Sequence, residues 1–513
     1  MRRRGGLGAY PVGNGLLRVT ATRGPRASSI LQMRRLPAIL AAILAAALAA
    51  PAAQGATSLV VRGAGYGHGV GMSQYGTLGF AQHGWDYRRI LGYYYQGTAI
   101  GKLTTSPTVR VLLQSGHARY TVSGAASAGA LKLDPAIAYT VVLADGRIVL
   151  QRGSKDLGTV DGTLRLQAPA DGALTLAGPA ANGLTGGAYR GALDLTRSGS
   201  GMIAVNTLPM ESYVAGVIAA EVSASWPAEA LKVQAVAARS YAMTTNAGGL
   251  GALFTQYADT RSQMYRGVRA ETPATSAAAN ATAGEVVTYA GEPVVTYFFS
   301  TSGGETENVE NSFIGSAPKP WLKGVPDPYD SVSPSHRWGP LRFTLADATR
   351  RLSGYVQGRL KRIRVVQRGV SPRIVRAQVI GTRGTSAITG PQLRRAFGLR
   401  DSWIVFRSFS TDVSKKPAVK TPAPATPGPG AAIGGPAPGI ASAGRAPRRV
   451  IFGRITPAQR GRWATVERLT GTTWTRAVDV LLAGGGRYRS TLPGPGVYRV
   501  RFGDMSGPQV TAG

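Results

Sequence analysis

The sequence contains no cysteine, which excludes disulfide bonds, thiolate zinc sites and a cysteine nucleophile. It has only four histidines, and none lies between His117 and His336. Acidic residues are also few: 25 Asp and Glu stand against 59 Lys and Arg, which gives a formal net charge of +34. Such a balance favours an anionic partner, such as nucleic acid, a membrane surface or a cell wall. Because the basic residues are spread along the chain without a recognisable nucleic-acid module, we expect no nucleic-acid partner.

The apolar run at residues 36–50 is short for a membrane-spanning helix. It has 15 residues, whereas such a helix needs about 18 to 20. A basic segment that begins at Met33 precedes the run, and small residues follow it through Ala56, which is the layout of a secretory signal peptide. We therefore expect a secreted or cell-wall-associated protein, in contact with a membrane only if this segment stays uncleaved. The 32 residues before Met33 are long for such a leader, and our hypothesis is that translation starts at Met33 and not at Met1.

Residues 206–242 predict two helices with one acidic residue, Glu221, at the corner between them. Pro209 fits the first turn of one helix, and Pro227 fits the first turn of the next with Ser225 as its N-cap. Apolar residues recur at helical spacing in both segments. They are Tyr213, Val214, Val217 and Ile218 in the first helix and Leu231, Ala235, Ala238 and Ala242 in the second.

Glu221 ends an almost wholly apolar helix. The negative end of the helix dipole and burial both disfavour a carboxylate there, so both raise its pKa. A carboxylic acid that keeps its proton near neutral pH can serve as a general acid. Arg239, on the second helix, would lower the pKa if it faced Glu221. The alternative interpretation is a surface glutamate that merely ends a helix.

The segments LPMESYVAGVIAAE at 208–221 and WPAEALKVQAVAARSYA at 226–242 resemble the signature of the stage II sporulation protein D / LytB (SpoIID/LytB) family. The resemblance implies that Glu221 is the catalytic acid of a lytic transglycosylase acting on peptidoglycan. It also leads us to place Gln234 and Arg239 among the substrate-binding residues. The family usually has Met-Pro after the acid, where this chain has Val222 and Ser223. That departure changes the local geometry and leaves the acid in place.

A glycine-rich segment, GHGVGMSQYG at 67–76, resembles a second motif of the same family. Many members carry it at the C-terminal end of the domain, whereas here it precedes the catalytic stretch. That order still works if the two ends of the domain lie close together. We expect His68, Gln74 and Tyr75 to border the same groove as Glu221. The alternative is a purely structural glycine-rich turn.

The loop YADTRSQMYRG at 257–267 corresponds to a region where several family members bind zinc through a His and a Cys. This chain has neither residue there, so we expect no metal and no cofactor. Asp259, Gln263 and Tyr265 match the rest of the family pattern. They would order the loop or touch the glycan.

The turn that begins at Ser300 resembles the family pattern S-S-G-G-x-T-E-N and follows an apolar run at 294–299, which predicts a buried strand. A polar, glycine-rich turn after a buried strand is a frequent place for a binding site. Glu305 and Glu307 are the main rivals of Glu221 for an acid/base role. The predicted groove residues of this turn are Ser300, Ser302, Gly303 and Thr306.

The pattern of elements predicts an α+β fold: a β-rich catalytic domain with a helical catalytic segment, followed by a small C-terminal immunoglobulin-like β-sandwich. Residues 414–448 are rich in Lys, Pro, Ala and Gly, which is typical of an extended linker. The expected parts are an N-terminal extension and signal peptide (1–56), a SpoIID/LytB-like domain (57–409), a linker (410–449) and the sandwich module (450–513).

The SpoIID/LytB-like domain has three expected segments: the Gly-His-Gly motif segment (58–98), a β-rich part (107–206) and the catalytic part (207–409). The first segment predicts helices at Ser73–His83 and Tyr87–Tyr95. Residues 107–206 contain short β-prone runs broken by Gly, Asp and Asn, which predict short strands and turns.

A single outstanding carboxylate fits a lytic transglycosylase better than a hydrolytic glycosidase, which usually needs two. The expected reaction cleaves the bond between N-acetylmuramic acid and N-acetylglucosamine and leaves a 1,6-anhydromuramic end. The expected partners are peptidoglycan glycan strands and a cell-wall amidase. Two alternatives remain: a non-catalytic amidase enhancer, as the LytB branch is described, and a wall-binding protein without activity.

Overall fold

The computed structural model describes residues 56–249, 251–415, 449–457 and 460–513. Its strands cover more residues than its helices, and the two are mixed along the chain, which confirms the predicted α+β class. The predictions about the signal peptide and the start of translation lie outside the described residues. None of the helices described is both long and apolar enough to span a membrane.

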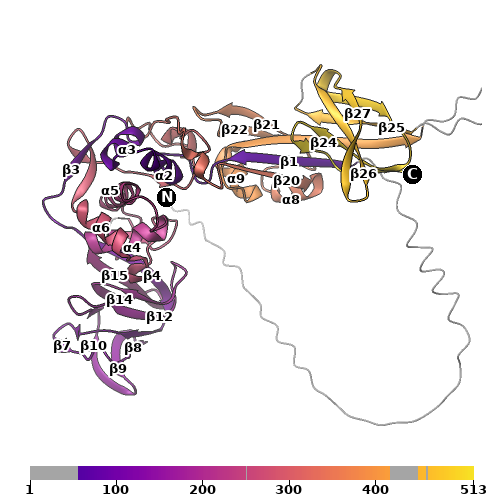
Figure 1. Cartoon of the computed structure of the whole chain (residues 1–513). Coiled ribbons are helices and arrows are strands. Elements are labelled where there is room, and N and C mark those ends of the chain that lie inside the picture. The colour runs from indigo at the N-terminus through magenta and orange to yellow at the C-terminus, as the bar shows by residue number, and fades with distance from the viewer. Residues whose placement is uncertain (1–55, 250, 416–448, 458–459) are drawn as a thin grey trace, which may run out of the picture. The chain divides into compact units, whose positions relative to one another are not determined.

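Two sheets account for the region predicted as short strands, residues 107–206 (Figure 1). Their inner faces share one hydrophobic core, to which the two helices around Glu221 also contribute. One sheet has the order β16 (Gln256–Tyr257), β4 (Thr108–His117), β15 (Gly201–Pro209), β14 (Ala192–Ser198), β11 (Thr163–Gln167), β6 (Ser127–Ala128), β7 (Leu131–Lys132). The other has the order β10 (Lys155–Val160), β9 (Arg147–Arg152), β8 (Tyr139–Ala144), β5 (Arg119–Ser123), β12 (Leu174–Pro179), β13 (Thr185–Tyr189).

The helices confirm most of the sequence-based expectations. The segments predicted around Ser73–His83, Tyr87–Tyr95 and on both sides of Glu221 are helical. The α-helices are α2 (Gln74–Gln82), α3 (Tyr87–Tyr94), α4 (Met210–Glu221), α5 (Ala228–Thr244), α6 (Pro273–Ala281), α7 (Val309–Ser312), α8 (Leu345–Arg351) and α9 (Gly390–Phe397). Short 3-10 turns lie at Gly267–Ala270, Asp330–Val332 and Gly484–Gly486.

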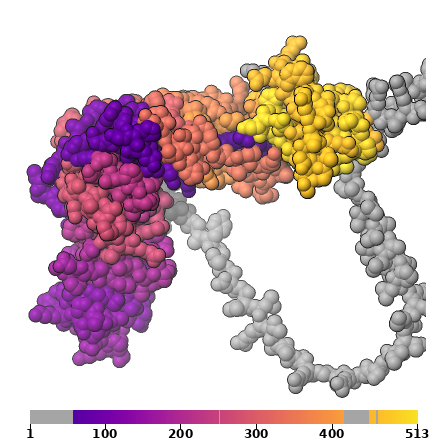
Figure 2. All heavy atoms as spheres, in the orientation of Figure 1, coloured from indigo at the N-terminus to yellow at the C-terminus, as the bar shows by residue number. Residues whose placement is uncertain are grey.

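The glycine-rich segment near the start of the described chain packs on the middle of the chain. Phe80 of α2 and Ile90 of α3 lie in one core with Val233 and Val236 of α5. Figure 2 shows the same arrangement as indigo atoms beside pink and red ones. Two small sheets complete this region: β18 (Glu292–Pro293), β17 (Glu285–Tyr289), β3 (Ala99–Lys102), and β19 (Phe298–Phe299) with β2 (Met72–Ser73).

The two ends of the predicted catalytic domain are hydrogen-bonded neighbours. Strand β1 (Ala56–Ala64) pairs antiparallel with β24 (Ile404–Lys415), with Val60 opposite Arg407. This confirms that the ends of the domain lie close together, as the displaced glycine-rich motif requires. The sheet continues on both sides in the order β20 (Arg337–Thr344), β1, β24, β25 (Arg449–Thr456), β28 (Arg487–Thr491). A separate sheet follows β20 and α8: β21 (Leu360–Arg368), β22 (Ile374–Gly381), β23 (Thr385–Thr389).

The C-terminal strands extend this sheet. Strand β25 pairs with β24, with Ile455 opposite Phe409, and both side chains belong to a core that also contains Val60. A second sheet faces the same core: β27 (Thr473–Leu481), β26 (Trp463–Thr470), β29 (Gly496–Phe502), β30 (Met505–Ser506), with β31 (Val510–Ala512) on β29. The immunoglobulin-like β-sandwich stays a prediction.

Several local predictions are wrong. Pro227, and not Ser225, is the N-cap residue of α5, and Pro209 likewise precedes α4 instead of lying in its first turn. The apolar run at 294–299 is a strand only at Phe298–Phe299. Strand β24 continues to Lys415, into the segment predicted as a linker, because β25 supplies its hydrogen-bond partners there.

We expect the facing residues Phe409 and Ile455 to be coupled energetically, because they contact each other between two strands of one sheet. In a double-mutant cycle with Phe409→Leu and Ile455→Val, the combined change in unfolding free energy should differ from the sum by about 0.5 kcal/mol or more. As the control, Ile455→Val and Val122→Ala, which lie in different cores, should add within about 0.5 kcal/mol. Additivity of the first pair in urea unfolding would contradict the packing of the C-terminal strands on β24.

Candidate functional site

Helix α4 delivers Glu221 to the corner between two helices. The helix begins after Pro209 and buries Tyr213, Val217 and Ile218 completely, so the sheets and α5 fix its position. It ends at Glu221 because the next residue, Val222, is extended. Glu221 therefore lies at the negative end of a helix whose other side chains anchor it in the core.

The Glu221 carboxyl is partly exposed and accepts two hydrogen bonds from neutral donors. The backbone N–H of Met264 donates to Oε1 at 2.6 Å, and Nε2 of Gln74 donates to Oε2 at 3.2 Å. Burial raises the pKa of Glu221, while these two donors and the positive charge of Arg266 lower it. Burial has the largest effect, so Glu221 keeps its proton to a higher pH than an ordinary glutamate does.

Gln74 also lies beside a second predicted site residue. Its Nε2 is 3.5 Å from Oε1 of Gln234, which is buried on α5, while Nε2 of Gln234 has no partner within the described residues. The two orientations of an amide are distinguished only by the hydrogen bonds they make. Turning both amides places Gln74 Oε1 where it accepts from a protonated Glu221 and from Gln234. The pair of glutamines can thus accommodate both protonation states of Glu221.

Arg239 does not reach Glu221. Its side chain is fully buried, and its guanidinium forms a two-pronged ion pair with Glu211 on α4, with distances of 3.0 and 2.6 Å. It also donates to the carbonyl of Glu285. Sequence analysis placed Arg239 among the substrate-binding residues, whereas the structure places it between α4 and α5, where it fixes the angle that presents Glu221.

The loop at 257–267 holds the Met264 amide against Glu221. Gln263 is buried and donates to the hydroxyl of Tyr213 and to the carbonyl of Ala238, and the buried Tyr265 donates to Asn206. Asp259 is turned away into an ion pair with Arg261. Of the two roles considered for this loop, the contacts of Gln263 and Tyr265 support ordering of the loop. Sequence reasoning could not find Met264, because its backbone and not its side chain acts on Glu221.

Two aromatic rings pack against each other, and one of them is next to Gln74 in the chain. The ring of Tyr75 lies 5.2 Å, between centroids, from that of Trp226, which directly precedes the α5 cap, and both side chains are partly exposed. The N–H of Tyr75 donates to the carbonyl of Ser300, so the start of α2 is tied to the predicted turn. Tyr75 and Ser300 are therefore brought to the region of Gln74, and Trp226 joins them without having been predicted.

A buried carboxylate, Asp330, organises the turn at 300–306. Its two oxygens accept from the N–H groups of Ser302 (2.8 Å) and Gly303 (2.9 Å), from the Ser73 hydroxyl (3.0 Å) and from Nδ1 of His336 (2.9 Å). Ser73 in turn caps α2. Asp330 therefore fixes the helix that carries Gln74, and Gly303, with φ of +78°, provides the turn conformation that points its amide at Asp330.

The remaining polar residues of the turn contact neighbouring segments of the protein interior. Ser302 and Thr306 are buried, and Thr306 exchanges hydrogen bonds with Val325. Glu307 is fully buried and accepts from the amides of Val370 and Ser371 and from the Ser371 hydroxyl. Glu307 is thus held away from Glu221.

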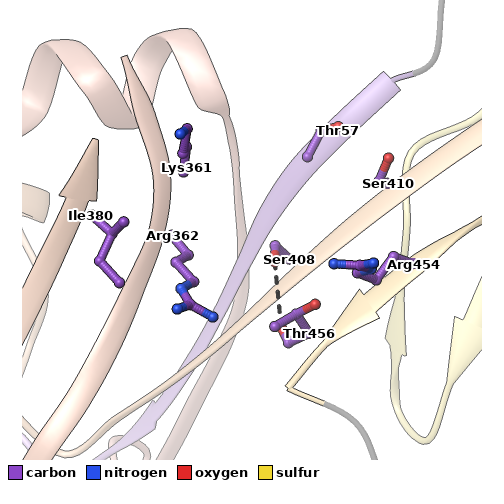
Figure 3. Close-up of a pocket in the computed structure, with 8 residues that line it drawn as sticks. All are labelled: Thr57, Lys361, Arg362, Ile380, Ser408, Ser410, Arg454 and Thr456. Atoms are coloured by element: carbon purple, nitrogen blue, oxygen red, sulfur yellow. Dashed lines mark hydrogen bonds between the residues drawn. The ribbon is translucent and has the colours of Figure 1, made fainter. Parts of the chain in front are cut away.

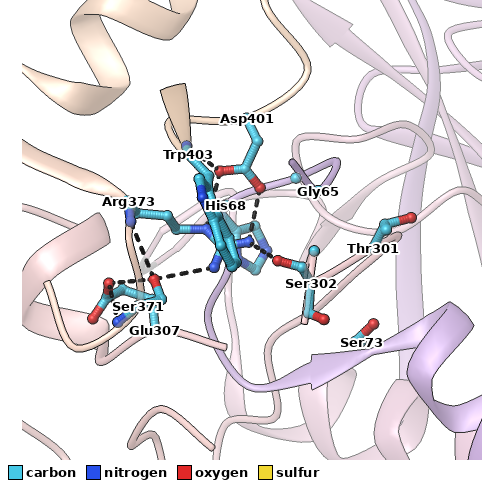
Figure 4. Close-up of polar contacts among 12 residues, drawn as sticks. Gly65, His68, Ser73, Thr301, Ser302, Glu307, Ser371, Arg373, Asp401 and Trp403 are labelled. Carbon is cyan, nitrogen blue, oxygen red and sulfur yellow. Dashed lines mark hydrogen bonds and ion pairs between the residues drawn. The ribbon is translucent and has the colours of Figure 1, made fainter. Parts of the chain in front are cut away.

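An interior ion pair lies on the other side of this turn (Figure 4). Arg373 pairs with Asp401 at 2.8 Å and donates to the carbonyls of Ser302 and Glu305, so one guanidinium holds the turn at two places. Burial, and then the charges of Arg394 and Arg373, lower the pKa of His68 to about 3.

His68 is therefore neutral at physiological pH, and its Nδ1 accepts from the N–H of Val70. Its ring packs against Phe299 and Phe313, and no contact joins it to Glu221 within the described residues. The structure brings Gln74 to Glu221 and does not bring His68 there. No group of three or more His, Asp or Glu side chains in the described residues could hold a metal ion.

Residues 198–289 match the model of the stage II sporulation protein (SpoIID) family. The chain carries a SpoIID domain. The matched segment contains α4, α5, Glu221 and Met264, while Gln74, the other donor to Glu221, lies outside it.

Curated relatives match parts of the chain. An uncharacterised protein of Brachyspira hyodysenteriae is 40% identical over 28% of this chain and 38% of its own length. Stage II sporulation protein D of Bacillus subtilis is 33% identical over 30% of this chain and 48% of its own length. The amidase enhancer of B. subtilis is 52% identical over 40 residues, which is 8% of this chain and 6% of that protein. The chain thus spans half or less of the length of these relatives.

We expect Gln74→Leu to raise the pKa of Glu221 further, because the substitution removes a donor that stabilises the carboxylate. The pKa is measured by carbon-13 NMR of labelled glutamate carboxyls across pH 3 to 9. Gln114→Leu, which removes a buried amide that donates to the carbonyl of Ala177, is the matched control and should leave the Glu221 titration unchanged. A lower or unchanged pKa in Gln74→Leu would contradict the contact.

We expect Arg239→Met to destabilise the protein by about 3 to 5 kcal/mol, because it leaves the Glu211 carboxylate without its buried partner. Chemical unfolding gives the change in free energy. Arg197→Met, at an exposed position of β14, should change it by about 0.5 kcal/mol or less. Equal effects of the two substitutions would show that the buried pair does not hold α4 against α5.

Proposed function

We propose that this protein is a peptidoglycan lytic transglycosylase with Glu221 as its catalytic acid. The observation that carries the proposal is the Glu221 carboxyl itself: partly accessible, with a raised pKa, and held by two neutral donors within a SpoIID domain. The rival Glu307 is fully buried and occupied by Ser371 and its neighbours. A reaction that needs one carboxyl group fits this arrangement.

The reaction would run in two proton transfers. Protonated Glu221 gives its proton to the oxygen between N-acetylmuramic acid and N-acetylglucosamine, and the bond from that oxygen to muramic C1 breaks. The C6 hydroxyl of the same muramic residue attacks C1, and its proton passes to the Glu221 carboxylate. Glu221 ends the cycle protonated, and the product carries a 1,6-anhydro ring. The nucleophile belongs to the substrate, so proximity supplies much of the rate.

The hydrogen bonds at Glu221 suit both halves of this cycle. Burial favours the protonated acid before the first transfer, and the N–H groups of Met264 and Gln74 stabilise the carboxylate that forms after it. The partly exposed rings of Tyr75 and Trp226 offer apolar faces to the sugars. Arg266 is exposed, has no ion-pair partner within the described residues and lies close enough to lower the pKa of Glu221. It would attract the lactyl carboxylate of peptide-stripped glycan.

A second candidate function rests on a different observation. The 40 residues that match the B. subtilis amidase enhancer at 52% identity make a non-catalytic role beside a cell-wall amidase the alternative. Both candidates place the protein outside the cell membrane, at the wall, and this location is part of the proposal.

The proposal is tested by digestion of intact and of peptide-stripped peptidoglycan with the 57–513 protein. Mass spectrometry should detect 1,6-anhydro ends with the wild type, and Glu221→Gln should reduce them by about 100-fold or more, since general acid–base catalysis typically contributes about 100- to 10,000-fold. Glu305→Gln, at the remaining rival carboxyl, should retain activity. Absence of anhydro ends on both substrates, together with stimulation of an added amidase, would replace the transglycosylase by the enhancer.

A further inference from the structure

A cavity of about 400 Å³ lies between strand β21 and the sheet formed by β1, β24 and β25. Figure 3 shows Lys361, Arg362 and Ile380 on one side of it and the strands of the larger sheet on the other. None of its lining residues contacts Glu221 or the groups that hold Glu221. The residues that line it are Thr57, Lys361, Arg362, Ile380, Ser408, Ser410, Arg454 and Thr456.

The lining of this cavity carries three positive charges and no negative charge. Lys361 and Arg362 come from β21, and Arg454 comes from β25. All three are exposed, and none forms an ion pair with an acidic residue among those the structure describes. Buried arginines elsewhere in the chain, such as Arg239 and Arg373, have carboxylate partners. Like charges so close together repel one another, so an anion between them would be stabilised.

A β-bulge places the two neighbouring cations together. Successive side chains of a regular strand point to opposite faces. The pairing of β21 with β22 shifts register between Leu360 and Arg362, so Lys361 is the extra residue of a bulge. Both Lys361 and Arg362 consequently line the same cavity. Lysines on an edge strand often only prevent aggregation, but that role does not require two adjacent side chains on one side.

The opposite wall is made of hydroxyl groups and one cation from a single face of the larger sheet. Ser408 and Ser410 are two residues apart on β24, Ser408 pairs with Thr456, and Ser410 pairs with both Arg454 and Thr57. This register aligns the side chains across three neighbouring strands. Hydroxyl groups donate hydrogen bonds to anionic oxygens, and arginine can bind two such oxygens at once.

We propose that this cavity is a binding site for a ligand that carries two or more phosphate groups close together. A single carboxylate would supply one negative charge against three positive ones. A phosphate monoester carries about 1.5 to 2 negative charges at neutral pH, so two neighbouring phosphates balance the three cations within this volume. Arginine matches phosphate oxygens in pairs and lysine serves as a point charge, while the hydroxyl groups supply the further donors.

The test measures binding of pyrophosphate and tripolyphosphate to the 57–513 protein by isothermal titration calorimetry at low salt. Citrate, a tricarboxylate of similar charge, is the comparison ligand. The variant Lys361→Gln/Arg362→Gln/Arg454→Gln should weaken phosphate binding at least tenfold. Its matched control, Arg376→Gln/Arg383→Gln/Arg395→Gln, removes three exposed charges outside the cavity and should weaken binding less than twofold.

Ser410→Asp provides a second, independent variant, since it adds a negative charge to the wall without removing a cation. It should weaken phosphate binding as well, and circular dichroism melting of each variant confirms that it is folded. Equal losses in the two triple variants would overturn the proposal in favour of general charge attraction. Citrate binding as tight as that of tripolyphosphate, or no binding of either phosphate, would overturn it too.

Discussion

The site depends on the burial of one carboxyl group against neutral hydrogen-bond donors. Burial without donors would favour only the protonated form of Glu221, and pairing with a cation would favour only the carboxylate. The structure avoids both extremes, because Arg239 is bound to Glu211 and the donors to Glu221 are an amide N–H and a glutamine. The groups that donate hydrogen bonds to Glu221 are therefore uncharged, and Arg266 affects the pKa of Glu221 less than burial does. A group in this state can give up a proton and regain it.

The donors come from segments far from Glu221 in the sequence, so the rest of the fold serves to bring them there. Gln74 lies at the start of α2, whose cap residue Ser73 is bound by Asp330. Asp330 also binds the Ser302–Gly303 turn, and Arg373 with Asp401 holds the same turn from the other side. The pairing of β1 with β24 makes this geometry possible, because it places the chain that leads into the glycine-rich motif beside the end of the domain.

The sequence predicted the elements that depend on local pattern. The apolar spacing on both sides of Glu221 predicted α4 and α5, and short β-prone runs broken by Gly, Asp and Asn predicted the strands of residues 107–206. It could not predict groups that act through distant contacts. Asp330 and Arg373 have no special sequence context, and Met264 contributes only its backbone N–H. His68 and Arg239 were grouped with Glu221 because motifs list residues together, whereas hydrogen bonding assigns them to separate parts of the interior.

The large positive net charge can be interpreted by asking which basic residues have an acidic partner and which do not. With 59 basic and 25 acidic residues, cations far outnumber the acidic residues that could pair with them, so an unpaired arginine alone indicates nothing. The positions of the unpaired cations relative to one another are more informative. A bulge turns Lys361 and Arg362 to one side of β21, opposite Arg454 and a row of hydroxyl groups. This arrangement brings positive charges together without stabilising the fold. Among the described residues the fully buried arginines, Arg239 and Arg373, have carboxylate partners, whereas these three cations lie together around a cavity. An anionic ligand explains this arrangement and packing does not.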